Sequence, residues 1–236
     1  MTARDTDART APRAMIVQGG WKGHEPDLCA ARFAAWLTGR GFAVTVRDSL
    51  DAYLDPEAMK DLAVILPLWT MGQIADKQRQ ALCAAVRSGV GLAGWHGGMC
   101  DAFRNDTDYQ FMTGGQWVAH PGGVIPYRVD SLDQLCPVTA GLKPFAMVSE
   151  QYYMHTDPGN RVLAWTTFSG QYGGCDWIEG TRMPVVWLRR WGKGRVFYTS
   201  LGHVNKDFDV PEAFEIVKRG IQWAAGLTIV PEYRSP

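Results

Sequence analysis

The chain has 236 residues, with 24 basic and 24 acidic side chains and a formal net charge of +0. This length suits one large α/β domain, and a content of 46% hydrophobic and 20% charged residues is normal for a globular protein. No block of like charge and no apolar run of about 20 residues is present, which argues against nucleic acid or a membrane as a partner.

The start of the chain and the cysteines indicate a protein of a reducing compartment. Residues 1–13 are polar and lack the apolar core of a secretion signal, so we expect a disordered leader before a single domain over residues 14–236. The five cysteines are scattered without a CxxC pair, which disfavours a disulfide framework or a structural zinc site. Because free thiols suit a reducing environment, we expect a cytoplasmic protein.

In the first half, apolar runs typical of strands alternate with segments of helical spacing. Strands are predicted at residues 14–18, 42–46, 62–68 and 90–95, and helices at 26–39, 56–61 and 77–87. The run at 62–68 is continuously aliphatic, as in a parallel strand that is buried on both faces. This alternation predicts right-handed βαβ units and a doubly wound parallel sheet.

The second half is less regular and rich in Gly, Pro, Asp and Asn between residues 97 and 180. Strands are predicted near residues 124–129, 146–148 and 162–168, a hairpin at 184–191 and 195–201, and a last helix from Pro211 through Trp223. Long insertions in α/β enzymes often build the functional site, so we expect this region to contribute side chains to it.

Three histidines each come shortly after a predicted strand: His24, His96 and His203. In open α/β sheets, ligands bind in the crevice beyond the carboxyl ends of the strands. We therefore expect these imidazoles to line a common cleft. Imidazole titrates near neutral pH and is a common metal ligand, so this cleft is the expected site of function.

His96 stands in the sequence Gly-Trp-His-Gly-Gly at residues 94–98. A strand followed by such a glycine frame resembles the sharp elbow that presents a nucleophile in hydrolases. Histidine in place of Ser or Cys disfavours covalent acyl chemistry, and Cys100 is a weak candidate nucleophile four residues later. The glycines would let a ligand approach closely, whereas the alternative is a histidine that caps a helix or lies in a loop.

The segment 150–155 is the other polar cluster. If it is extended, Glu150, Tyr152 and Met154 face one way and Gln151, Tyr153 and His155 the other. Glu150 is a candidate general base and His155 a candidate ligand or acid, with a solvated strand edge as the alternative. His120 is interpreted as a loop histidine, and Asp101 as an acidic residue close enough to His96 to point into the cleft.

Several segments resemble motifs of a known family. They are residues 91–98, 149–153, 184–198, 202–203 and 220–224. Together they are similar to the ThuA-like family, named for a trehalose-utilisation protein, over nearly the whole chain from about residue 14. The resemblance implies a three-layer α/β sandwich with a mostly parallel central sheet, like flavodoxin and the class I glutamine amidotransferases. Because His96 replaces the amidotransferase cysteine, no amidotransferase activity is expected.

The resemblance also implies sugar metabolism, on trehalose-type disaccharides or their keto-sugar derivatives. We expect an enzyme with hydrolase- or lyase/isomerase-type chemistry. In one mechanism, imidazoles and a carboxylate hold a divalent metal such as zinc; in the other, a histidine and Glu150 act as acid and base without a metal. The catalytic candidates are His96, Glu150, Tyr153 and His203, the metal-ligand candidates His24, His96, His155 and His203, and the substrate-binding candidates Trp21, Trp69, Gly97, Gly98 and Asp101.

Two other readings of the sequence remain. One is a non-catalytic carbohydrate-binding or regulatory module on an old enzyme scaffold, which would tolerate conservative histidine changes. The other, an FMN-binding flavodoxin relative, is disfavoured because the loop after the first strand is not the Ser/Thr-rich phosphate cradle of such proteins. No nucleotide or flavin is therefore expected. The expected partner is a small-molecule sugar, and exposed aromatic surface is compatible with a homo-oligomer.

Overall fold

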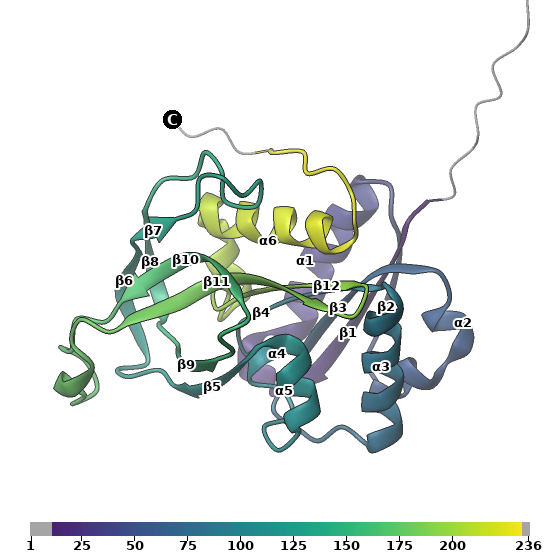
Figure 1. Ribbon diagram of the computed structural model, residues 1–236, viewed down its shortest axis with the longest axis horizontal. Coiled ribbons are helices and arrows are strands. Elements are labelled where there is room, and N and C mark those ends of the chain that lie inside the picture. Colours follow the sequence, from purple (N-terminus) through teal and green to yellow (C-terminus); the bar gives the residue numbers. More distant parts are fainter. Residues whose placement is uncertain (1–10, 233–236) are drawn as a thin grey trace, which may run out of the picture.

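An eight-stranded sheet runs through the middle of the molecule (Figure 1). The computed structural model describes residues 11–232. The strands are β1 (Arg13–Gly20), β2 (Ala43–Arg47), β3 (Leu62–Thr70), β4 (Gly91–Trp95), β5 (Gly115–Ala119), β6 (Val124–Val129), β7 (Ser131–Leu132), β8 (Phe145–Glu150), β9 (Tyr153–Thr156), β10 (Arg161–Thr167), β11 (Arg182–Trp191) and β12 (Gly194–Thr199). The α-helices are α1 (Pro26–Gly39), α2 (Pro56–Met59), α3 (Asp76–Ser88), α4 (His96–Cys100), α5 (Thr107–Thr113) and α6 (Pro211–Ala224).

The large sheet is mostly parallel. Its order is β2-β1-β3-β4-β12-β11-β10-β7, and all neighbours from β2 to β12 pair in parallel. From β12 onward the pairing becomes antiparallel through β11 and β10 to β7. The parallel part has the 2-1-3-4-5 order of flavodoxin-like sheets, with β12 as its fifth strand. This confirms the predicted α/β fold with a mostly parallel central sheet.

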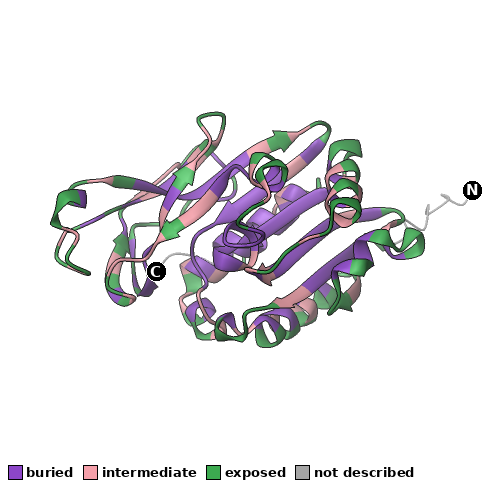
Figure 2. Cartoon of the chain, turned by 90° about the horizontal axis from the view of Figure 1, so that it is seen from below, coloured by how far each residue is buried: buried purple, intermediate pink, exposed green. Residues whose placement is uncertain are grey.

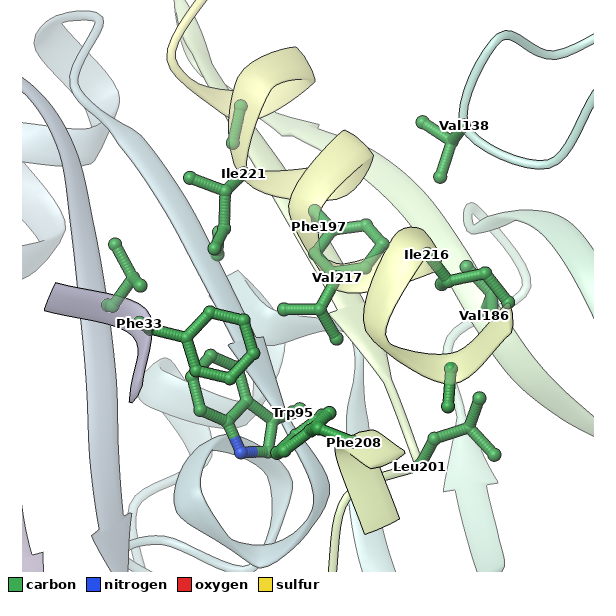
Figure 3. Packing of buried hydrophobic residues seen from close by; sticks show 14 of the residues in the cluster. Phe33, Trp95, Val138, Val186, Phe197, Leu201, Phe208, Ile216, Val217 and Ile221 are labelled. Carbon is green, nitrogen blue, oxygen red and sulfur yellow. The ribbon is translucent and has the colours of Figure 1, made fainter. Parts of the chain in front are cut away.

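Helices cover both faces of this sheet, which gives three layers. Helices α1 and α6 lie on one face, and α3, α4 and α5 lie on the other (Figure 1). The first face is filled by large side chains, among them Phe33, Trp95, Phe208 and Val217 (Figure 3). The Phe33 and Trp95 rings lie 4.3 Å apart between centroids, and Phe33 meets Phe208 edge-on at 4.9 Å. This packing fixes α1 and α6 against the strands that carry the site.

Burial follows the layers. The middle strands are almost wholly buried, whereas the outer surfaces of the helices and the ends of the loops are exposed (Figure 2). Along β1, Ala14 and Ile16 pack toward one face, and Met15 and Val17 pack toward the other. A central parallel strand loses contact with water on both sides, which explains the continuous apolar runs of the sequence.

The regular first half of the chain matches its prediction closely. Pro26 is the first residue of α1, where its missing N–H costs no hydrogen bond, and α3 ends at Gly89 with φ of 135°. The predicted strands near 124–129, 146–148 and 162–168 are confirmed as β6, β8 and β10. No prediction was made for α5, β5 or β9. Strands β5 and β9 form one small sheet, and β6 and β8 form another.

Residues 1–10 of the expected leader and the last residues, 233–236, lie outside the described part. Arg13, expected to be the last residue of the leader, belongs to strand β1, where it pairs with Ala43 and Leu62. Within residues 11–232, no helix combines the length and the apolar character needed to cross a membrane.

Candidate functional site

Four imidazoles from distant parts of the chain converge on one carboxylate. Glu150 Oε2 lies 3.5 Å from His96 Nε2 and 3.9 Å from His24 Nε2. Glu150 Oε1 lies 3.5 Å from His203 Nε2 and 3.8 Å from His120 Nε2. In every case the Nε2 atom faces the carboxylate, so the four rings share one orientation toward a common centre. We call these five residues the histidine cluster.

The parallel sheet delivers three members of the cluster. His24 follows β1 in a short 3₁₀ helix (Lys22–His24), His96 follows β4 directly, and His203 follows β12. These are the carboxyl ends of parallel strands, where ligands bind in doubly wound folds. The two small sheets deliver the other members, because Glu150 ends β8 and His120 follows β5. The predicted convergence of His24, His96 and His203 is therefore observed in the structure.

The backbone at His96 makes the elbow that the glycine frame suggested. His96 has φ of 44°, a left-handed conformation that few non-glycine residues adopt. The next residue, Gly97, allows the rings to come close: a Cβ there would lie 2.4 Å from His24 Cε1 and 3.0 Å from the Tyr152 hydroxyl. A Cβ at Gly98 would lie 3.1 Å from Leu68 Cα, which explains a second small residue. The glycines thus serve close packing around the imidazoles.

The other ring nitrogens have partners that hold the imidazoles in place. His24 Nδ1 lies 2.8 Å from Thr70 Oγ1, and His96 Nδ1 lies 2.9 Å from the Tyr152 hydroxyl. The backbone of the third histidine, His203, is held by Asp207. Asp207 Oδ2 accepts hydrogen bonds from His203 N and from Ser149 Oγ. When each Nδ1–H donates to its hydroxyl oxygen, the Nε2 lone pair faces the centre. This is the arrangement by which metal-binding histidines are usually oriented.

Two buried atoms at the centre have no hydrogen-bond partner among the described residues: His96 Nε2 and Glu150 Oε2. Nitrogen lone pairs and a carboxylate that face one another across 3.5–3.9 Å repel unless a proton or a cation lies between them. Buried polar atoms are normally paired, and these two atoms can be paired by a proton or by a cation between them.

Burial keeps the inner imidazoles neutral. Desolvation, helped by the nearby imidazoles of His203 and His120, lowers the pKa of His24 from 6.5 to about 3. Desolvation and the three neighbouring histidines lower the pKa of His96 well below its usual value. At neutral pH both rings are therefore uncharged, which is the form that binds a metal ion.

The donor set fits a divalent cation. One ligand atom from each of His24, Glu150 and His203 can be chosen so that all three lie within 4.8 Å of one another. Two imidazoles and a carboxylate form a common protein site for zinc and for other first-row metals. His96 and His120 stand around the same carboxylate and are available as a fourth ligand or as proton carriers.

The structure does not bring all expected site residues to the cluster. Tyr153 packs against Phe168, with ring centroids 5.6 Å apart, and His155 is exposed on β9 opposite Gln116. Tyr153 and His155 are expected at the site from the sequence, but β8 ends at Glu150 and a new strand starts at Tyr153 and pairs with β5, so both belong to a different sheet from Glu150. Tyr152 lies at the cluster instead.

The remaining expected residues lie around the cluster at different depths. Trp21 is 47% exposed and meets the His24 ring edge-on at 4.8 Å, whereas Trp69 is half-buried and lies across Gly19. Asp101 is buried and ion-paired with Arg104 at 2.6 Å. Arg104 in turn lies over the Trp117 ring, whose centroid is 5.6 Å from that of His120.

Cys100 does not behave as an activated nucleophile. It is fully buried in helix α4, and burial raises the pKa of its thiol far above the usual value. Reactive cysteines need a lowered thiol pKa and access to solvent, so Cys100 is a packing residue.

His120 is the functional candidate that sequence reasoning missed. The neighbouring residues Ala119 and Pro121 do not indicate a functional site, because no long regular strand that could be recognised in the sequence precedes His120. Its side chain is 38% exposed, the highest value among the four imidazoles. The His120 imidazole therefore lies at the solvent side of the cluster. It stacks over the Tyr152 ring, with ring centroids 6.4 Å apart.

Comparison with known proteins places the chain in a family. The family model ThuA, described as trehalose utilisation, matches residues 13–224. No curated protein matches the chain. A solved structure of a β-galactosidase from Bacillus circulans sp. alkalophilus contains a region of similar fold, with 14% identity and a TM-score of 0.56 over 96% of this chain and 32% of that chain.

Two solved structures are similar over nearly their whole length. A protein described as ThuA-like from Bacteroides uniformis has 18% identity and a TM-score of 0.73, covering 93% of this chain and 95% of that chain. One from Parabacteroides merdae has 16% identity and a TM-score of 0.73, covering 94% of each. At these identities the structures show the shared fold, and the family model extends over nine-tenths of the sequence. The chain belongs to the ThuA family.

Proposed function

We propose that this protein is a divalent-metal-dependent enzyme that acts on a sugar. The observation that carries the proposal is the convergence of four Nε2 atoms on the Glu150 carboxylate, with His96 Nε2 and Glu150 Oε2 buried and unpartnered. Residues His24, Glu150 and His203 would hold the cation, and zinc suits a set of two imidazoles and one carboxylate.

A sugar substrate is supported by the family and by the surroundings of the cluster. The family model is described as trehalose utilisation, so trehalose-type disaccharides and their keto derivatives are the first compounds to screen. Trp21 exposes about half of its side chain next to the His24 ring, which gives a flat apolar wall of the kind that fits the face of a pyranose.

The chemistry divides between the cation and the surrounding side chains. A bound divalent metal supplies Lewis acidity that polarises a carbonyl or hydroxyl oxygen of the sugar. His96 and Tyr152 form a buried hydrogen-bonded pair that can hold a proton, since burial raises the pKa of the Tyr152 phenol and keeps it protonated. His120, at the solvent side, is positioned to exchange protons between the substrate and water.

The test is metal content. Protein produced in zinc-supplemented medium should contain about one equivalent of zinc per chain by elemental analysis. Both His203→Ala and Glu150→Gln should lose most of it. His155→Ala is the matched control, because His155 is exposed on β9 away from the cluster, and it should keep the wild-type zinc content.

The outcomes separate the alternatives. Absence of any metal from wild-type protein made with excess zinc, iron or manganese contradicts the proposal and favours acid–base chemistry by a histidine and Glu150 alone. Stoichiometric metal with sugar binding but no turnover of disaccharides, aryl glycosides or alkyl glycosides, whether oxidised or unoxidised, favours a non-catalytic carbohydrate-binding module. Turnover that is lost in His203→Ala and kept in His155→Ala supports the enzyme.

A further inference from the structure

A groove opens beside the histidine cluster, between β8 and the 3₁₀ helix Asn205–Asp209. Its volume is about 560 Å³, within the range of small-molecule sites. His203 forms part of its wall, and the same imidazole has its Nε2 3.5 Å from Glu150 Oε1. A molecule bound in the groove would therefore extend directly from the candidate metal site.

The groove is lined mainly by aliphatic side chains. Val124 on β6 and Val148 on β8 are 55% and 69% exposed, and these two strands pair side by side at one end of the molecule (Figure 1). Val204 and Val210, from either side of the 3₁₀ helix, also line it. An apolar groove of this kind, bordered by polar residues, is a typical ligand-binding feature.

The carboxylates of the groove are already engaged. Asp207 Oδ2 accepts hydrogen bonds from Ser149 Oγ and His203 N. Asp209 Oδ1 accepts one from Arg32 Nη2 at 2.8 Å. Besides His203, the exposed Lys206 and the outer oxygen of Asp209, the lining is apolar, so a second sugar ring bound here would lose more water from its hydroxyls than these groups replace, which is unfavourable. An apolar group makes no hydrogen bonds to water, so it would lose none by entering the groove.

We propose that this groove binds the apolar aglycone of a glycoside whose sugar ring lies at the histidine cluster. The proposal rests on the proposed function, because it takes the cluster as the reacting end of the site. It narrows the substrate class from disaccharides to aryl or alkyl glycosides, or their keto derivatives. The four valines recognise the aglycone, and Trp21 and the cluster recognise the sugar.

The test compares four ligands by titration calorimetry on zinc-loaded protein: methyl glucoside, the two anomers of phenyl glucoside, and trehalose. Phenyl glucoside should bind about tenfold tighter than methyl glucoside, because its ring buries apolar surface in the groove. Trehalose should bind no tighter than methyl glucoside. Val148→Asp should remove the advantage of the phenyl group, and Ala146→Trp, which fills the groove, should do the same. Val46→Asp is the control, because Val46 is 43% exposed on the distant edge strand β2.

Equal affinities for phenyl and methyl glucoside, tighter binding of trehalose, or no binding of any glucoside would overturn the proposal. So would a loss of the phenyl advantage in Val46→Asp that matches the loss in Val148→Asp. Zinc content is measured on the same samples. If zinc is absent while a phenyl preference sensitive to Val148→Asp persists, the metal function fails and the aglycone groove stands.

Discussion

Replacement of Gly97 by alanine tests how tightly the imidazoles are packed. The new Cβ would lie 2.4 Å from His24 Cε1, 2.6 Å from His24 Nδ1 and 3.0 Å from the Tyr152 hydroxyl. Ordinary carbon contacts are about 3.5–4 Å, so the His24 ring must retreat by about 1 Å. Gly97 itself has no positive φ, so the effect comes from contact and not from backbone strain.

The retreat has two measurable consequences. Overpacking of this kind costs about 1–3 kcal/mol in the free energy of unfolding, measured by urea denaturation of the metal-free protein. Displacement of His24 from its hydrogen bond with Thr70 should weaken zinc binding about 10–100-fold, measured by competition with a chelator.

Gly39→Ala is the matched control, because a Cβ at that helical position meets nothing within 4 Å. It should leave the zinc affinity unchanged and alter the stability by less than about 1 kcal/mol. Wild-type stability together with wild-type zinc affinity in Gly97→Ala would refute the close packing described here.

Three further predictions concern stability. The folded protein holds His24 neutral with a pKa of about 3, whereas the same histidine in the unfolded chain takes up a proton as the pH falls below 6.5. The free energy of unfolding of the metal-free protein should therefore fall by about 1.4 kcal/mol per pH unit below pH 6.5. His96 adds to this loss, and bound zinc should oppose it; a flat stability between pH 7 and 5, by urea denaturation, would contradict neutral imidazoles at His24 and His96. Phe33→Ala should cost about 3–5 kcal/mol, since Phe33 is fully buried, and a cost below 1 kcal/mol would show that this core is not close-packed. Glu215→Ala should cost about 3–5 kcal/mol, because it leaves the buried Arg219 guanidinium, 2.7 Å from Glu215 Oε1, without its carboxylate; thermal unfolding at the wild-type temperature would contradict this.

The sequence predicts the part of the site that the parallel sheet carries. His24, His96 and His203 each follow a strand whose apolar run is readable locally, and parallel strands present their carboxyl ends at one rim. The glycine frame around His96 also identifies a close approach, which the contacts at Gly97 explain. Period-two alternation would place Glu150 and Tyr152 on the same face only if residues 150–155 formed one strand, whereas both reach the cluster although β8 ends at Glu150 and β9 starts at Tyr153.

The rest depends on pairings between distant segments. His120 reaches Glu150 because β5 pairs with β9 and β6 pairs with β8, with Val124 opposite Glu150. These strands have only four to six residues each, and β6 contains Pro126, so no local pattern specifies their partners. His155 looks like a ligand by residue type alone, yet the chain changes sheets between Glu150 and Tyr153 and leaves its side chain in solvent.

One divalent cation is expected to bind among His24, Glu150 and His203. Anomalous diffraction at the zinc absorption edge, from crystals of zinc-loaded protein, locates the ion directly. We expect one strong anomalous peak about 2 Å from His24 Nε2, His203 Nε2 and a Glu150 carboxylate oxygen. An anomalous peak elsewhere on the protein, or no peak in crystals grown with excess zinc, would contradict this cation site.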